Sequence, residues 1–165
     1  MNVWTTYPSP VGDLLLTADE TGLTAIRLDT KLPPDAVRMD DHPGFFPARN
    51  WLDRYFRGEA PDITEVPIHL VGTAFQQQVW EILMTVPRGS TVTYGQIAKQ
   101  IAQLRGIKTM SSQAVGQAVG ANPISILIPC HRCVGVGGKL TGYAWGLDKK
   151  IWLLRHEGNL KEEAK

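Results

Sequence analysis

The residues best suited to chemistry stand together at positions 130–133. Cys130 precedes His131 and Arg132, and a second cysteine, Cys133, completes a Cys-x-x-Cys spacing. A nucleophilic cysteine needs thiolate character, which a neighbouring base, cation or oriented amide supplies. The competing interpretation is an inert buried thiol, which is what most cysteines are. The Cys130-His131 pair alone does not decide between the two.

Cys133 has three interpretations: a small core side chain, a redox-sensitive partner of Cys130, or one ligand of a metal ion. A structural zinc ion takes four protein ligands, and no second cysteine cluster accompanies this pair. We therefore favour the core side chain and expect neither a metal nor another cofactor.

The segments around these residues must position them. The apolar run 122–128 predicts a buried strand that delivers Cys130 at its end. A helix follows the later loop, with Asp148 as its expected cap, and Glu157 falls near the helix C-terminus. An acid there opposes the helix dipole, so Glu157 is either solvated or paired.

Three helices are predicted upstream of the apolar run. Two capping-box signatures each precede a helical apolar stripe, and they pair Thr73 with Gln76 and Thr93 with Gln96. A third helix, 113–120, follows a loop in which Ser111 or Ser112 can act as the cap. This order is the outline of a helix-turn-helix, although many all-helical cores have the same pattern.

The third helix is rich in glycine. Gly116 and Gly120 each cost roughly 1 kcal/mol relative to alanine in a helix. The glycines allow either close packing against another helix or close approach to a nucleic-acid backbone, and composition leaves both open.

The first half of the chain has a different pattern. Residues 1–30 alternate like the strands of an antiparallel meander, a proline-rich loop follows, and a short helix contains Trp51, Leu52, Tyr55 and Phe56. We predict an α+β protein. A small N-terminal α/β domain (1–70) with an antiparallel sheet precedes a mainly helical C-terminal domain (71–165) with a winged-helix-like helix-turn-helix and an active-site loop.

Charge divides at the same point. Residues 1–70 contain 6 Lys/Arg and 11 Asp/Glu, whereas residues 71–165 contain 11 and 5, and the whole chain carries +1. A basic second half weakly favours a polyanionic partner. No signal peptide is visible and no apolar stretch reaches the ~18 residues of a membrane span, so we expect a cytoplasmic protein with no membrane partner.

Four ordered segments carry a family resemblance: Asn122-Pro123, residues 128–132 (Ile-Pro-Cys-His-Arg), residues 141–143 (Thr-Gly-Tyr) and residues 152–158 (Trp-Leu-Leu-Arg-His-Glu-Gly). Together they closely resemble the O6-alkylguanine-DNA alkyltransferases, also called methylated-DNA–protein-cysteine methyltransferases. The resemblance is strong over residues 73–158 and covers the N-terminal half in outline only.

The resemblance implies DNA repair by direct reversal. One alkyl group passes irreversibly from O6-alkylguanine, or from O4-alkylthymine, to Cys130 after the base is flipped out of double-stranded DNA. Each molecule reacts once, as a suicide enzyme. No cofactor and no obligate protein partner are implied, and we expect a monomer.

The family pattern also assigns roles to residues. Cys130 matches the nucleophile and alkyl acceptor, His131 the base that acts through a water, and Glu157 the carboxylate that orients the histidine. Asn122 matches the residue that braces the active-site segment. Tyr94 matches the proton donor to guanine, which also contacts a phosphate.

Further positions match the DNA-binding and base-pocket residues of the family. The DNA-binding set is Thr93, Ser112, Gln113, Ala114, Gly116, Gln117 and Arg132. The base-pocket set is Gly142, Tyr143, Ala144 and Trp145.

Four features depart from the family pattern, and one of them is Cys133, which stands where an aliphatic residue is common. Gln113 stands where an arginine is usual, so we expect modest, non-sequence-specific DNA binding. The loop 103–110 is longer than usual, and its Arg105 and Lys108 are candidate phosphate contacts. Trp145 stands where many members have glycine, and at the mouth of the pocket it would exclude bulky alkyl groups.

Three other functions compete with alkyl transfer. Alkyltransferase-like proteins bind the lesion without reacting, but those relatives replace the cysteine. A helix-turn-helix regulator leaves Cys130, Tyr143 and Glu157 without a role. A cysteine hydrolase does not fit the narrow motif. A methyl group found on Cys130 after incubation with alkylated DNA distinguishes the first interpretation from all of these.

Overall fold

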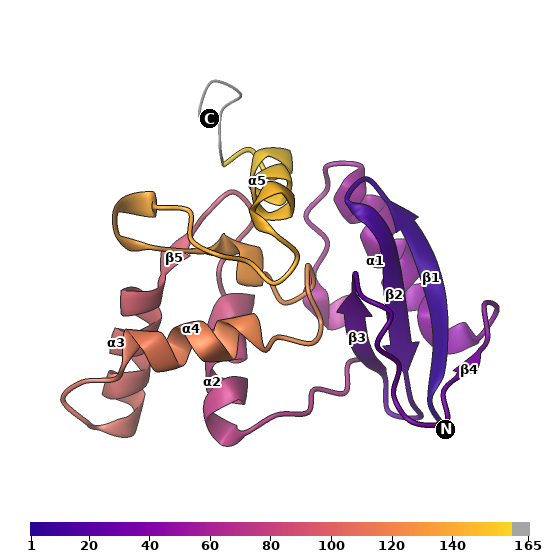
Figure 1. Cartoon of the computed structure of the whole chain (residues 1–165), viewed down its shortest axis with the longest axis horizontal. Coiled ribbons are helices and arrows are strands. Elements are labelled where there is room, and N and C mark those ends of the chain that lie inside the picture. The colour runs from indigo at the N-terminus through magenta and orange to yellow at the C-terminus, as the bar shows by residue number, and fades with distance from the viewer. Residues whose placement is uncertain (160–165) are drawn as a thin grey trace. The chain divides into compact units, whose positions relative to one another are not determined.

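The computed structural model describes residues 1–159, which fold into two compact units (Figure 1). The first unit contains Met1–Val71 together with Pro123–Ser125. The second contains Gly72–Asn122 and, within the described chain, residues 126–159. Among the described residues, no helix has both the length and the apolar character needed to cross a membrane.

A four-stranded sheet is the centre of the first unit. Its strands are β1 (Val3–Ser9), β2 (Gly12–Ala18), β3 (Leu23–Arg27) and β4 (Val37–Arg38), in the order β3-β2-β1-β4. The predicted antiparallel meander is confirmed by β1, β2 and β3. The two-residue strand β4 adds a parallel edge to β1, which the alternation pattern did not indicate.

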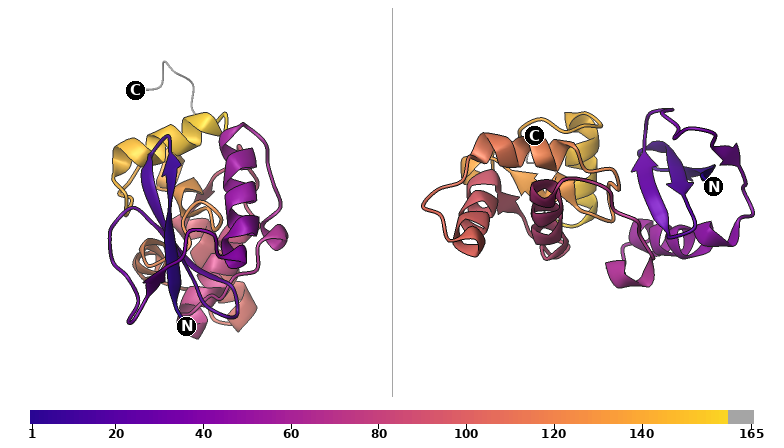
Figure 2. Two further views of the ribbon diagram at one scale, coloured as in Figure 1. Left: turned by 90° about the vertical axis from the view of Figure 1, so that its right-hand side faces the viewer. Right: turned by 90° about the horizontal axis from the view of Figure 1, so that it is seen from below.

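Helix α1 (Phe46–Phe56) packs beside this sheet, as Figure 2 shows. The hydroxyl of Tyr7 on β1 donates a hydrogen bond to Asp53 at 2.5 Å. Trp51 and Tyr55, both predicted on the apolar face, are buried and stack at 5.4 Å. The short 3₁₀ turns η1 (Pro43–Phe45) and η2 (Ile63–Glu65) flank the helix.

Four helices form most of the second unit. They are α2 (Ala74–Met84), α3 (Tyr94–Arg105), α4 (Ser112–Gly120) and α5 (Leu147–His156). Both predicted capping boxes are confirmed, and Ser111 caps α4. Trp80 on α2 donates its indole N–H to the carbonyl of Ala118 on α4 at 2.9 Å. The prediction that Asp148 caps α5 is wrong, because Gly146 is the cap residue and no side chain bonds there.

A two-residue parallel ladder completes the second unit. Strand β5 (Val92–Thr93) pairs with β6 (Cys133–Val134), with Val92 opposite Cys133. The turns η3 (Cys130–Arg132) and η4 (Val136–Gly138) stand before and after β6. Since α3 begins immediately after β5, the ladder brings the start of α3 next to the cysteine segment.

The predicted strand over 122–128 is not continuous. Ile124 makes an isolated bridge with Ile26 of β3, and the amide of Ile26 donates to the carbonyl of Pro123. The chain then turns at Ile126, whose φ of 75° is unusual for a β-branched residue. Ile126 is also where the chain returns to the second unit, so the bend marks a change of unit.

Candidate active site

The segment that carries Cys130 is held by backbone bonds around Ile128. The amide of Cys130 donates to the carbonyl of Ile128 at 2.8 Å, and the side-chain amide of Asn122 donates to the same carbonyl at 2.8 Å. The amide of Cys133 bonds back to the carbonyl of Cys130. The Cys130 side chain is therefore presented from a fixed turn, and Asn122 lies where a bracing residue should.

His131 lies in a fully buried pair with Glu157. The imidazole Nε2 is 2.6 Å from Oε2 of Glu157, and neither side chain is exposed. The other ring nitrogen, Nδ1, is buried and has no hydrogen-bond partner among residues 1–159. An imidazole with one nitrogen fixed by a carboxylate and the other unpaired is suited to accept a proton.

Arg132 belongs to the same buried network, and its expected role as a DNA contact stays a prediction. Its Nε and Nη2 donate to the two carboxylate oxygens of Glu157 at 2.8 and 2.9 Å. Its Nη1 donates to the carbonyl of Val86 at 2.7 Å. The guanidinium faces the interior because a buried carboxylate requires a charged partner.

The pKa values of the pair follow from these contacts. Burial by itself raises the pKa of Glu157, but the hydrogen bonds and charges of His131 and Arg132 outweigh it and hold the pKa far below its usual range. Burial lowers the pKa of His131, although the carboxylate of Glu157 acts in the opposite direction. At neutral pH the pair is therefore a carboxylate and a neutral imidazole.

Lys150 is a residue of this site that the sequence interpretation missed. It is buried, and its Nζ donates to the carbonyl of Cys133 at 2.6 Å. Its charge lies within electrostatic range of both cysteines. Spacing could have revealed it, since Lys150, Leu153, Leu154 and Glu157 follow the i, i+3, i+4, i+7 pattern of the buried face of α5.

Cys133 lies in the core beside Lys150. It is fully buried, and burial raises the pKa of its thiol to about 12. A neutral, buried thiol fits the interpretation of Cys133 as a core side chain. Neither cysteine is in a disulfide. Within residues 1–159, no cluster of three or more His, Cys, Asp or Glu residues is arranged to hold a metal ion.

Tyr94, the first residue of α3, connects the cysteine turn to the predicted base-pocket segment. Its hydroxyl is 3.0 Å from Oγ1 of Thr141, and its side chain lies within electrostatic range of Cys130 and Cys133. Burial raises the pKa of Tyr94, although the Thr141 contact opposes the rise, so the phenol stays protonated. Thr141 was not among the predicted site residues.

The four predicted base-pocket residues follow Thr141 directly. Tyr143 and Trp145 are half-buried and meet edge to face at 5.9 Å, whereas Gly142 and Ala144 are exposed. The amide of Gly146 donates to the carbonyl of Tyr143, which closes this segment as a turn before α5.

Helix α4 presents most of the predicted DNA-binding residues. Ser112, Gln113 and Gln117 are exposed, while Ala114, Gly116 and the preceding Thr93 are half-buried. The glycines are not required by helix packing. A methyl group added at Gly120 meets nothing within 4 Å, and one added at Gly116 meets only the Tyr94 ring, at 3.7 Å. Of the two interpretations of this helix, the structure favours space for a ligand.

Comparison with protein families matches nearly the whole described chain. Residues 2–70 match the ribonuclease-like domain of 6-O-methylguanine DNA methyltransferase, and residues 74–159 match the DNA-binding domain of the same family. The second match contains every residue of the buried network and of α4.

Curated relatives and solved structures agree with the family match. The chain is 40% identical to a methylated-DNA–protein-cysteine methyltransferase of Haemophilus influenzae, over 93% of this chain and 85% of that protein. It is 41% identical to one of Methanosarcina acetivorans, over 93% and 96%.

The fold is also similar to that of Mycobacterium tuberculosis OGT solved in complex with DNA. The TM-score is 0.82 at 40% identity, over 94% of this chain and 93% of that one. An O6-methylguanine DNA methyltransferase of Methanococcus jannaschii gives a TM-score of 0.65 at 26% identity, over 95% and 94%. The chain therefore belongs to the 6-O-methylguanine DNA methyltransferase family and is a DNA-binding methyltransferase of DNA repair.

Proposed function

We propose that Cys130 attacks the alkyl carbon of O6-alkylguanine in DNA. A carbon–sulfur bond forms as the bond between that carbon and O6 breaks. The thiol proton passes to Nδ1 of His131, directly or through one water, and Tyr94 supplies a proton to the departing guanine. The proton on His131 then restores Tyr94 through solvent, so the net products are an S-alkyl cysteine and an unmodified guanine.

The buried contact between His131 and Glu157 is the observation that supports this proposal best. It leaves Nδ1 as the one unpaired ring nitrogen beside the cysteine turn, with a carboxylate that stabilises the imidazolium when it forms. Tyr94 lies within electrostatic range of Cys130 and is the proposed proton donor, and its contact with Thr141 connects it to the predicted base-pocket segment with Tyr143 and Trp145.

Several finer features belong to the proposal. The target atom is stacked inside duplex DNA, so we infer base flipping, at a cost of a few kcal/mol. O4-alkylthymine presents a similar alkyl carbon and is a second substrate. A thioether has no easy leaving group, so each molecule reacts once. We also infer that the reaction needs no protein partner. The two free thiols suit a cytoplasmic protein, and we infer that it acts as a monomer. Residues 1–70 brace the alkyl-acceptor and DNA-binding domain, residues 71–165.

Mass spectrometry tests the proposal directly. The protein is incubated with a duplex containing O6-methylguanine, digested, and compared with protein given the same duplex with guanine. We expect one methyl group, on the peptide that contains Cys130. The matched control is Cys133→Ala, which should gain the same methyl group, whereas Cys130→Ala should gain none.

The negative outcomes are also informative. Protein that binds the alkylated duplex but never gains mass would be a non-reacting lesion binder. A methyl group on Cys133 and none on Cys130 would show that the proposal names the wrong cysteine as the alkyl acceptor.

A further inference from the structure

The DNA-binding half of the chain contains a long segment without acidic residues. From Ile82 to Leu147 there is no Asp or Glu, and the nearest acids are Glu81 and Asp148. The segment has six cationic side chains: Arg88, Lys99, Arg105, Lys108, Arg132 and Lys139. One sign of charge over such a length favours contact with a polyanion.

The three arginines of this segment contact other residues of the protein, and only Arg132 is buried. Arg132 is paired with Glu157, and Arg88 donates to the carbonyl of His156 at 2.8 Å. Arg105 was a candidate phosphate contact, but its Nε donates to Gln78 at 2.8 Å and its guanidinium lies over a phenylalanine ring of α2. The exposed positive charge therefore comes from Arg105, whose guanidinium is held against α2, and from Lys99, Lys108 and Lys139.

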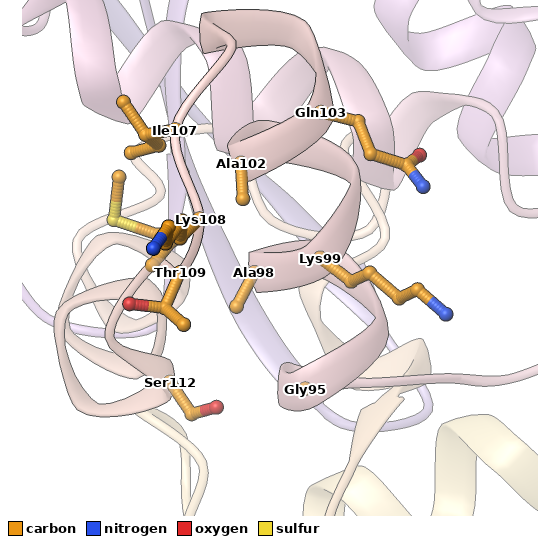
Figure 3. Close-up of a pocket in the computed structure, with 10 residues that line it drawn as sticks. Gly95, Ala98, Lys99, Ala102, Gln103, Ile107, Lys108, Thr109 and Ser112 are labelled. Atoms are coloured by element: carbon orange, nitrogen blue, oxygen red, sulfur yellow. The ribbon is translucent and has the colours of Figure 1, made fainter.

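Two of these lysines line one cavity, between α3 and the loop that leads to α4 (Figure 3). Gly106, with a φ of 67°, ends α3 in the left-handed conformation, and the amide of Ile107 bonds back to the carbonyl of Ala102. The loop then runs beside α3. The space between them has a volume of about 350 Å³.

The lining of this cavity is donor-rich and contains no carboxylate. Small residues of α3 form one side, with Ala98 and Ala102 facing the loop in Figure 3. The loop side contributes Lys108 and Thr109, and Ser112 contributes a hydroxyl at the start of α4. Lys99 lines the cavity from α3, and its amino group extends away from the loop in Figure 3.

We propose that this cavity binds a phosphate of the DNA backbone, through Lys108 and the hydroxyls of Thr109 and Ser112. A lysine ammonium and two hydroxyls provide hydrogen-bond donors for an anion. Lys99 is exposed on a flexible stem and neutralises the neighbouring phosphate of the same strand. The lengthened loop thus adds a backbone contact close to Gln113, where the family arginine is absent. This inference rests on the proposed function, because the DNA that carries the lesion is the ligand of both.

Salt dependence of DNA binding tests the inference. Each phosphate neutralised by a protein cation contributes about 0.9 to the slope of log K against log salt concentration for duplex DNA. We expect Lys108→Gln to reduce the magnitude of this slope by about 0.9, and Lys99→Gln with Lys108→Gln to reduce it by about 1.8. Fluorescence anisotropy on one unmodified duplex at several salt concentrations gives the slopes.

Lys31→Gln is the matched control, because it removes the same charge from an exposed position of the first unit. Slopes that are unchanged in the double variant, or reduced equally by Lys31→Gln, would overturn the inference. A wild-type protein that never gains a methyl group contradicts the proposed function alone, since the slopes still report on the phosphate contact.

Discussion

His131 and Glu157 are separated by 26 residues in the chain and by 2.6 Å between Nε2 and Oε2 in the fold. Arg132 donates to both oxygens of the same carboxylate, which keeps Glu157 ionised. An ionised carboxylate accepts hydrogen bonds, so the proton of the neutral imidazole lies on Nε2. Nδ1 is therefore the nitrogen with a free lone pair, and the direction of proton transfer is set by this contact.

Replacement of Glu157 by glutamine should slow alkyl transfer without changing the thiol. The neutral amide does not stabilise an imidazolium. Because an amide can either accept or donate a hydrogen bond, it also no longer fixes the imidazole proton on Nε2 of His131. We expect the single-turnover rate to fall roughly 10²- to 10⁴-fold, the range for loss of a general base or of its orienting acid. Quenched-flow measurement of methylated Cys130 on O6-methylguanine duplex gives the rate.

The same variant should be less stable, because Arg132 then lacks its charged partner in a buried place. Loss of one member of a buried pair costs about 3–5 kcal/mol. The reaction rates of the variant and the wild type are therefore compared at a temperature below the thermal unfolding midpoint of the variant. Glu81→Gln, on the exposed side of α2, is the matched control and should change neither rate nor stability. Equal rates for the Glu157 variant and the wild type would remove the orienting role of Glu157.

Stability should fall as the solution becomes acidic, in two overlapping steps. The pKa of His131 is lowered from 6.5 and that of Glu157 from 4.5, so the unfolded chain binds these protons at higher pH than the folded one. Where the unfolded state holds more protons, stability rises with pH. The contribution is fully present above the unfolded value of His131 and is lost as pH falls below 6.5 and then below 4.5.

Urea unfolding between about pH 8 and pH 2 measures the free energy of unfolding over both steps. Asp29, paired with Arg27 and with a pKa lowered to about 2, contributes to the same acid loss, so the wild-type curve is not specific. The difference in free energy of unfolding between the wild type and Glu157→Gln isolates the contribution of the buried His131–Glu157 pair. The prediction is wrong if that difference stays constant across the whole pH range.

Local interactions were predictable from the sequence. The capping boxes at Thr73 and Thr93 were confirmed because a cap joins residues three apart, whatever surrounds them. The meander of β1 to β3 was confirmed because alternation and short turns determine such pairing locally. The family resemblance correctly indicated the family, and the structure brings His131 and Glu157 together as it implied.

Side-chain direction was not predictable at the site. Arg132 is adjacent to His131 in sequence, but its partners are a carboxylate 25 residues later and a carbonyl 46 residues earlier. Lys150 is buried because its amino group donates to a carbonyl 17 residues earlier, a contact that its neighbours in sequence do not indicate. The break at Ile126 depends on the chain changing units, which an apolar run does not encode.

Helix α4 offers a paired test of its glycines. Gly116→Ala and Gly120→Ala should each stabilise the fold by roughly 0.8–1.0 kcal/mol, because a methyl group fits at both positions and alanine favours the helix. At Gly116, beside Tyr94, the methyl group also occupies the surface that the proposed function gives to DNA. There we expect roughly tenfold weaker binding, equivalent to about 1.4 kcal/mol.

Thermal unfolding and anisotropy on the same two variants separate the effects. Gly120, at the last turn of α4, should gain stability with little change in DNA affinity. Equal losses of affinity at both positions would mean that the helix backbone does not approach DNA near Gly116.

Trp145 should restrict the size of the alkyl group that reaches Cys130. It is half-buried and packs edge to face on Tyr143. Both residues follow Thr141, whose hydroxyl contacts the hydroxyl of Tyr94. Replacement by glycine removes an indole from the proposed mouth of the base pocket. We expect Trp145→Gly to react at least tenfold faster with O6-benzylguanine, which corresponds to a barrier lowered by about 1.4 kcal/mol.

The rate with an O6-methylguanine duplex should change little in the same variant, because a methyl group needs no added space. Trp152→Phe is the matched control: it alters an aromatic residue of α5 that stacks on His156 outside the proposed pocket. The control should leave the ratio of benzyl to methyl rates unchanged. A wild-type protein that already reacts with benzylguanine as fast as with methylated duplex would show that Trp145 does not restrict the size of the alkyl group.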